Sequence, residues 1–264
     1  MAVITLLTDF GEKDGYVGIM KGVIEGIAPG TRVIDLSHEI HPHNITEAAY
    51  LLGRSYPYFP SGTIHCCVVD PGVGTSRHGM AARFGDQFFV GPDNGLASVL
   101  LREQAQKEQP IQTVALTNAQ YWLPQISRTF HGRDIFAPVA AHLALGVDLL
   151  DLGEELEQPV LLDLPEASRD QDEMSGEIIH VDAFGNLASN IRFPSFSSES
   201  VIHISIGDLS DIPLLQTYGE ALPGQVVAVI DSFGFVAVCV VNGNASRELG
   251  VGIGEQIRVK FLSV

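Results

Sequence analysis

The first 150 residues alternate apolar β-forming segments with helical ones, and this alternation limits the possible folds more than any other feature of the chain. The expected strands and helices lie at residues 3–8, 15–30, 32–37, 45–56, 63–70, 87–91, 96–104, 113–117 and 134–146. Strands joined by helices form a mostly parallel sheet. The continuous apolar run at 63–69 is typical of a strand that is covered on both faces. We therefore expect an N-terminal layered α/β domain over residues 1–160.

The character of the sequence changes after this region. Residues 151–176 are acidic, contain two prolines and have weak periodicity, so we expect an acidic linker at 161–175. From residue 176 onward, short β-forming segments are separated by glycine-marked turns and no helical run occurs. This pattern predicts a C-terminal all-β, barrel-like domain over residues 176–264.

Charge and cysteine content restrict the partners and the compartment. The formal net charge is −17, which argues against binding to nucleic acid or to an anionic membrane surface. No apolar run approaches the roughly 20 residues of a membrane span, and the N-terminus resembles a core strand rather than a signal peptide, so we expect a cytoplasmic protein. Cys66 and Cys67 are neighbours in one expected strand and should face opposite sides, so we expect these two and Cys239 to be buried thiols.

Polar side chains stand where the expected strands end. Asp9, Asp35 and Asp70 follow the first three strands, and Asp93 lies in the turn after the fourth. A single aspartate at such a position is commonly a cap or turn residue. Ligands of open α/β sheets, however, bind beyond the carboxyl ends of the strands. Several such residues converging on one edge therefore indicate a pocket, to which the segment FHGRD at 130–134 adds a histidine just before the last helix.

Other site motifs do not fit. The triplet DFG at 9–11 opens the chain, whereas in protein kinases the catalytic loop precedes it. The glycines after Asp70 do not match the phosphate-binding pattern GxxxxGK[ST]. His38, His41 and His43 could form a loose metal site, but their position in a loop favours surface histidines. With no HExxH or CxxC motif, we expect neither a metal site nor a cofactor.

Five segments, in chain order, resemble one family. They are TDFG at 8–11, VVDPGVGTSR at 68–77, FHGRD at 130–134, FGN at 184–186, and SFG at 232–234 followed by NGNA at 242–245. Together they are similar to the S-adenosyl-L-methionine (SAM) hydrolases (adenosine-forming), or SAM hydroxide adenosyltransferases, which are relatives of fluorinase and chlorinase. The resemblance implies hydrolysis of SAM to adenosine and L-methionine. It also implies a homotrimer whose active sites lie between the N-terminal domain of one subunit and the C-terminal domain of a neighbour.

The resemblance also assigns site residues. The catalytic, water-handling residues of the family fall on Asp70, Arg77 and His131. The substrate contacts fall on Asp9 for the ribose hydroxyls, Asp182 for the methionine ammonium, Asn186 for the adenine edge, Ser232 for the amino-acid end, and Asn244 and Ala245 for the base. Fluorinase has an arginine after this serine, where the present chain has Phe233, so the partner of the methionine carboxylate stays open.

The reaction needs groups of this kind. A sulfonium sulfur leaves C5′ as a neutral thioether, so the difficulty lies in aligning and deprotonating the attacking water. Arg77 can stabilise hydroxide character, and either Asp70 or His131 can take the proton. Two alternatives remain: a 5′-halogenase using chloride, which the negative charge of Asp70 disfavours, and a non-catalytic protein that binds SAM or adenosine.

Overall fold

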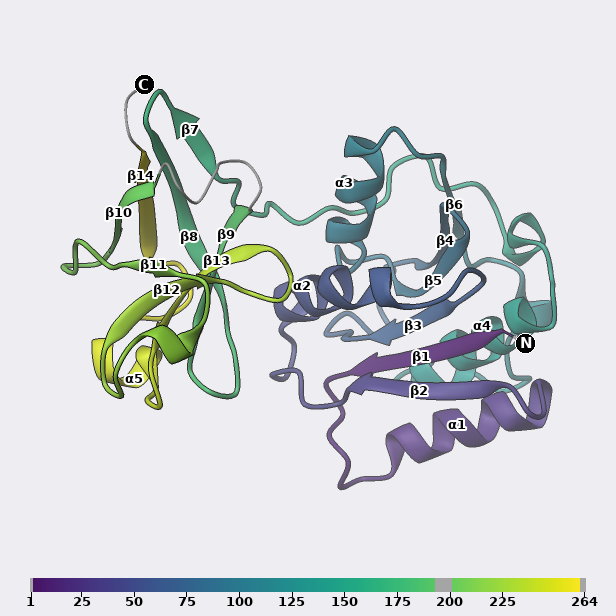
Figure 1. The fold of residues 1–264 in the computed structure, drawn as a ribbon. Coiled ribbons are helices and arrows are strands. Elements are labelled where there is room, and N and C mark those ends of the chain that lie inside the picture. The colour runs from purple at the N-terminus through teal and green to yellow at the C-terminus, as the bar shows by residue number, and fades with distance from the viewer. Residues whose placement is uncertain (1, 193–200, 262–264) are drawn as a thin grey trace. The chain divides into compact units, whose positions relative to one another are not determined.

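The computed structural model describes residues 2–192 and 201–261, and the chain divides into two compact units, Met1–Leu162 and Asp163–Val264 (Figure 1). Within the described ranges, no helix is long and apolar enough to cross a membrane. Each unit has hydrophobic clusters of its own.

The first unit is built on one six-stranded sheet with the order β2-β1-β3-β5-β4-β6. Its strands are β1 (Val3–Thr8), β2 (Arg32–Ser37), β3 (Ile64–Val68), β4 (Gly79–Phe84), β5 (Gln87–Pro92) and β6 (Ile111–Ala115). Strands β2, β1, β3 and β5 are parallel neighbours, whereas β4 runs antiparallel to both β5 and β6. The predicted mostly parallel α/β fold is therefore confirmed, with one reversed strand.

The reversed strand β4 is the element that the sequence pattern did not indicate. Its residues, GMAARF, contain a glycine and two alanines, which are not β-formers, and they lack a clear polar alternation. Tertiary context fixes this segment as a strand, because β4 lies between β5 and β6 and is hydrogen-bonded on both sides. Its position in the sheet is set by these pairings rather than by local propensity.

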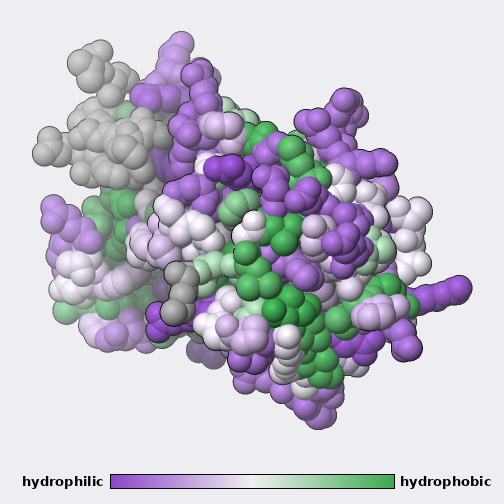
Figure 2. All heavy atoms as spheres, turned by 90° about the vertical axis from the view of Figure 1, so that its right-hand side faces the viewer, coloured by the Kyte–Doolittle hydropathy of each residue, from purple (hydrophilic) through white to green (hydrophobic). Residues whose placement is uncertain are grey.

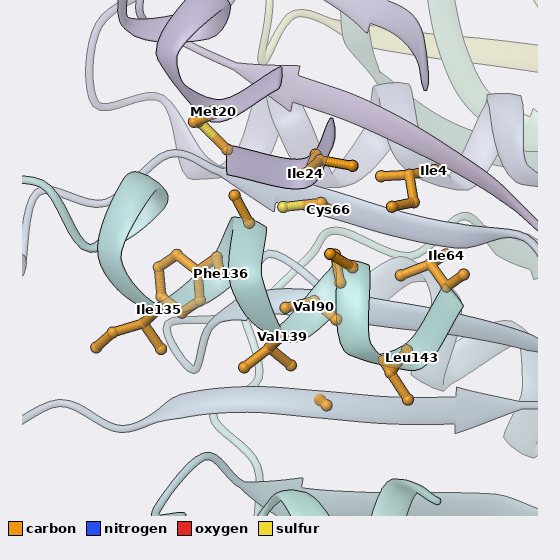
Figure 3. Packing of buried hydrophobic residues seen from close by; sticks show 14 of the residues in the cluster. Ile4, Met20, Ile24, Ile64, Cys66, Val90, Ile135, Phe136, Val139 and Leu143 are labelled. Carbon is orange, nitrogen blue, oxygen red and sulfur yellow. The ribbon is translucent and has the colours of Figure 1, made fainter. Parts of the chain in front are cut away.

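Helices cover both faces of this sheet. They are α1 (Tyr16–Ile27), α2 (Ile45–Ser55), α3 (Ser98–Gln106), a π-helical turn (Gly132–Phe136) and α4 (Ala137–Ala144), with short 3₁₀ turns at Tyr56–Tyr58, Ala119–Tyr121 and Leu149–Leu152. Side chains of α1 and α4 pack with Cys66 on one face (Figure 3), whereas α2 and α3 pack with Cys67 on the other. The adjacent cysteines therefore face opposite sides, and both are buried free thiols, as the sequence predicted.

The second unit is a barrel-like sheet with the order β10-β14-β8-β9-β13-β12-β11, and β7 pairs with β8. Its strands are β7 (Ser168–Asp170), β8 (Glu173–Val181), β9 (Leu187–Arg192), β10 (Val201–Ile206), β11 (Leu214–Leu215), β12 (Val226–Ile230), β13 (Phe235–Val240) and β14 (Gln256–Phe261). A 3₁₀ turn (Tyr218–Glu220) and a short helix α5 (Ala245–Leu249) complete it. The all-β character predicted for this part is confirmed, and β7 lies in the segment for which we expected a linker.

Candidate active site

Asp70 and Arg77 form an ion pair at the carboxyl end of β3. The buried strand ends two residues before Asp70, and the loop then returns so that Arg77 Nε donates to Asp70 Oδ1 at 2.8 Å. A second hydrogen bond joins Arg77 Nη2 to Asp70 Oδ2, which makes the pair bidentate. The side chain of Asp70 is only 4% exposed and that of Arg77 only 12%, so the pair is largely removed from bulk water.

His131 joins this pair through the same guanidinium. Arg77 Nη2 donates to His131 Nδ1 at 2.9 Å, and the guanidinium carbon lies 5.3 Å from the centre of the Phe136 ring. Burial lowers the pKa of His131, as does the positive charge of Arg77, while Asp70, Asp134 and the backbone of Ser127 partly offset the shift. Since an arginine can only donate, Nδ1 must be an acceptor, and the proton of the neutral ring is then on Nε2.

Two features hold together the loops that carry Arg77 and His131. Gly74 has a φ of +75°, and a Cβ there would lie 2.2 Å from the carbonyl oxygen of Arg128, so only glycine permits this close approach. The carboxylate of Asp134 accepts hydrogen bonds from Ser127 N at 2.7 Å and from Arg133 Nε at 2.6 Å. Burial raises the pKa of Asp134, but these hydrogen bonds lower it overall and keep the carboxylate charged. Asp134 therefore fixes the loop that presents His131.

Asp9, the expected ribose-binding residue, follows β1 directly and is half-buried. Its Oδ2 accepts a hydrogen bond from the backbone nitrogen of His43 at 2.8 Å, and His43 has a left-handed φ of +68°. The next residue, Phe10, belongs to a trio of edge-to-face rings with Tyr16 and Phe130. Asp9 and His131 thus both adjoin this aromatic trio in the chain, because Phe10 follows Asp9 and Phe130 precedes His131.

The surface position expected for His38 is wrong. Its side chain is 2% exposed and is hydrogen-bonded to Thr8, whereas the side chain of His41 is 82% exposed. Burial here depends on the packing of the loop after β2 against the end of β1, which no spacing in the sequence indicates. Among the described residues, no group of three histidine, cysteine or acidic side chains could hold a metal ion.

Not every strand-end residue belongs to the cluster around Arg77. Asp93 Oδ1 accepts from the backbone nitrogen of Val160 at 2.8 Å, and Asn94 Nδ2 donates to the carbonyl of Val69 at 2.9 Å. Asp35 pairs with Lys21 at the end of β2. These three side chains have local structural partners, in keeping with the common role of such residues in turns.

In the second unit, Asp182 and Asn186 are the two ends of the β8–β9 turn. Asp182 Oδ1 accepts from the backbone nitrogens of Phe184 at 2.9 Å and Asn186 at 2.8 Å, and its Oδ2 accepts from Asn186 Nδ2 at 2.8 Å. Gly185 has a φ of +85°, as this tight turn requires. The carboxylate of Asp182, itself an expected substrate contact, therefore also holds Asn186, the other expected contact in this turn.

The structure brings this turn against the expected base-binding loop. Ser246 N donates to Gly185 O at 3.0 Å, and a Cβ on Gly185 would lie 2.2 Å from the side-chain amide carbon of Asn244. Asn244 caps α5 by accepting from Arg247 N at 2.8 Å, and Ala245 is fully buried behind it. Asn186 therefore shares one end of the second unit with Asn244 and Ala245, from which it is far apart in the sequence.

Ser232 lies in the β12–β13 turn, which repeats the geometry of the β8–β9 turn. Asp231 Oδ1 accepts from the backbone nitrogens of Phe233 and Phe235, both at 2.9 Å, and Ser232 itself is exposed. The pKa of Tyr218 is raised to about 12 by burial first, then by the neighbouring Cys239 and by the charges of Asp182 and Asp231. The two turns therefore place negative charge near the same protonated tyrosine.

Comparison with known proteins agrees with both units. The N-terminal domain model of the SAM hydroxide adenosyltransferases matches residues 4–153, and the C-terminal domain model matches residues 176–258. The (R)-S-adenosyl-L-methionine hydrolase of Salinispora tropica is 39% identical and covers 97% of each chain, while a fluorinase of Actinoplanes sp. is 26% identical and covers 89% of this chain and 90% of its own. The crystal structure of an uncharacterized conserved protein from Thermotoga maritima has a TM-score of 0.90 at 35% identity, covering 97% of this chain and 99% of that one. The chain belongs to the SAM hydroxide adenosyltransferase family.

Proposed function

We propose that the protein is an enzyme that hydrolyses SAM to adenosine and L-methionine, with water attacking C5′. The observation that carries this proposal is the bonded cluster of Asp70, Arg77 and His131 at the carboxyl end of β3. Four relatives named (R)-S-adenosyl-L-methionine hydrolase support it, because they are 34–39% identical over 97–98% of this chain.

The leaving group sets what the protein must supply. Sulfur departs from the sulfonium as a neutral thioether, so its departure needs no proton. The attacking water, in contrast, must lie in line with the C–S bond and must lose a proton as the C–O bond forms. The residues that hold this water therefore determine the rate of the reaction.

Within this cluster, the geometry favours Asp70 as the proton acceptor. Neutral His131 already uses Nδ1 to accept from Arg77 and carries its proton on Nε2, so neither nitrogen can accept another proton in this arrangement. Each oxygen of Asp70 bonds to Arg77 through one lone pair and keeps another. A carboxylate is basic enough for this step, because the oxygen of the attacking water becomes strongly acidic as it bonds to carbon. Arg77 orients the carboxylate of Asp70 through its two hydrogen bonds, and His131 holds Arg77 in place.

The remaining contacts follow the family resemblance. Asp9 would accept hydrogen bonds from the ribose 2′- and 3′-hydroxyls, because two carboxylate oxygens suit a vicinal diol. Asn186, together with the backbone of Asn244 and Ala245, would bind adenine. Asp182 would pair with the methionine ammonium and Ser232 with the amino-acid end; the negative charge near Tyr218 favours such a cationic group.

Assembly and location are part of the proposal. We propose a homotrimer in which the first unit of one subunit and the second unit of a neighbour complete each active site. Exposed apolar side chains such as Tyr16 and Ile19, each 45% exposed, suit burial in an assembly, and Figure 2 shows patches of hydrophobic side chains on the face it draws. The three free thiols suit a cytoplasmic protein, and the net charge of −17 suits one that binds no nucleic acid.

Product analysis tests the reaction. The purified protein is incubated with SAM in chloride-containing buffer, and the nucleosides are separated by liquid chromatography with mass detection. We expect adenosine and methionine in equal amounts. Chlorinated deoxyadenosine would instead identify a halogenase, and saturable binding of SAM without turnover would identify a binding protein.

A further inference from the structure

His38 holds the chain on both sides of Asp9. Its Nδ1 lies 2.9 Å from the hydroxyl oxygen of Thr8, the residue before Asp9, and its carbonyl accepts from the backbone nitrogen of Gly11 at 2.8 Å. The Thr8 hydroxyl also accepts from the backbone nitrogen of Phe10 at 3.2 Å. Thr8 and Gly11 are thus bonded to His38, by its ring and by its backbone carbonyl, and Phe10 is bonded to the hydroxyl of Thr8.

The donors and acceptors of this network have one consistent direction. Asp35 Oδ1 lies 3.1 Å from His38 Nε2, and a carboxylate oxygen can only accept, so this contact favours the ring proton on Nε2 and leaves Nδ1 to accept from the hydroxyl of Thr8. Lys21 Nζ donates to the other oxygen of Asp35 at 2.6 Å. The ring of His38 is therefore hydrogen-bonded to Thr8 at one nitrogen and lies against the Asp35–Lys21 ion pair at the other.

The same loop also contacts the carboxylate of Asp9. The backbone nitrogen of His43 donates to Asp9 Oδ2 at 2.8 Å, which fixes the rotation of the carboxylate group. A vicinal diol must meet two carboxylate oxygens at hydrogen-bonding distance together, so a small rotation of Asp9 would lose one of the two contacts. The residues between His38 and His43 are thus in a position to set the orientation of Asp9.

We propose that His38 is a positioning residue for the substrate's ribose: through Thr8 and Gly11 it holds Asp9 in the orientation that binds the 2′- and 3′-hydroxyls. This inference rests on the proposed function, because it takes the nucleoside diol as the ligand of Asp9. It extends that function by assigning diol selectivity to a network that begins at Lys21. A purely structural His38 would affect the binding of all nucleosides equally.

The test compares the binding of adenosine and 2′,3′-dideoxyadenosine by isothermal titration calorimetry. Wild-type protein should prefer adenosine by about 100-fold, as expected for two hydrogen bonds to a charged acceptor. Thr8→Val keeps the shape of the buried side chain but removes the hydroxyl, and His38→Leu removes the ring contacts. Both should reduce the preference to about tenfold or less and change dideoxyadenosine affinity less than about threefold. His38→Asn, whose side-chain oxygen can replace Nδ1 as an acceptor, should recover part of the preference.

Controls separate this inference from the function on which it rests. His41→Ala alters an exposed histidine of the same loop and should keep the full preference. Asp9→Asn should abolish the preference, and His38→Leu should then add nothing in that background. If Asp9→Asn abolishes the preference but Thr8→Val and His38→Leu leave it intact, or weaken both nucleosides equally, only the role of His38 is refuted. If Asp9→Asn keeps the preference, or wild-type protein shows none, the role of Asp9 as the ribose contact is refuted together with that of His38, while product analysis still decides the proposed hydrolysis. If His38→Leu does not fold, Thr8→Val decides.

Discussion

Replacement of Asp70 by asparagine should lower both the turnover and the stability of the protein. Asp70→Asn keeps the size of the side chain but removes the charge and one of the two acceptors that bind Arg77. Loss of a proton acceptor in the transition state typically lowers turnover by about 10²–10⁴-fold. We therefore expect kcat for adenosine formation to fall by that factor, with a much smaller change in KM, because the proposed mechanism places Asp70 against the attacking water rather than against the bound nucleoside.

The same variant should also be less stable. One hydrogen bond between charged groups is worth about 1.5–3 kcal/mol, and the side chains of this pair are only 4% and 12% exposed, so solvent compensates little. At about 2–4 °C per kcal/mol, the Tm should fall by about 3–12 °C. Turnover is measured by chromatography of adenosine, and Tm by scanning calorimetry.

A matched variant controls for the loss of a buried carboxylate. Asp93→Asn changes another aspartate beyond a strand of the same sheet, whose Oδ1 accepts from a backbone nitrogen that asparagine can still satisfy. Its kcat should stay within about threefold of wild type, which corresponds to a loss of transition-state stabilisation below about 1 kcal/mol. If Asp70→Asn keeps wild-type kcat, or if both variants lose turnover equally, the assignment of Asp70 as proton acceptor is refuted.

Three further predictions concern the loops, the acid limb of activity and the core. Gly74→Ala should lower both stability and kcat, because its Cβ would lie 2.2 Å from Arg128 O; Gly62→Ala, which also has a positive φ but nothing within 4 Å, should cost about 1 kcal/mol and leave kcat unchanged. Protonation of His131 would remove the acceptor for Arg77, so kcat should decrease as the pH is lowered through an apparent pKa below 6.5. A pH profile of His131→Asn that kept this acid limb would refute the assignment of the limb to His131. Burial lowers the pKa of His65 in the core from 6.5 to about 4. As the pH falls, the unfolded chain therefore takes up the proton first, and the free energy of unfolding should drop by about 3 kcal/mol between pH 6.5 and 4. Urea titrations in which His65→Gln shows the same drop would contradict this.

Some parts of the site could be predicted from the sequence because they depend on local spacing. Asp70 and Arg77 are seven residues apart in a glycine-containing loop after a buried strand, so their contact follows from the turn itself. The opposite faces of Cys66 and Cys67 follow from the period of a strand.

Other parts depend on contacts between distant segments and could not be predicted. Strand β4 is stabilised by its neighbours rather than by its own composition. The burial of His38 depends on packing against Thr8, thirty residues away. The approach of His131 to Arg77 needs the fit of Gly74 against Arg128, so the motifs could name these residues but not the direction of their hydrogen bonds.

The fate of the water oxygen tests the central claim most directly. A single turnover of SAM by excess protein in ¹⁸O-labelled water should give adenosine that carries one ¹⁸O at the 5′-oxygen and unlabelled methionine. The label should enter at a rate that falls about 10²–10⁴-fold in Asp70→Asn. Adenosine without label, a 5′-halogenated nucleoside in place of adenosine, or equal rates in the two proteins would contradict water attack at C5′ assisted by Asp70.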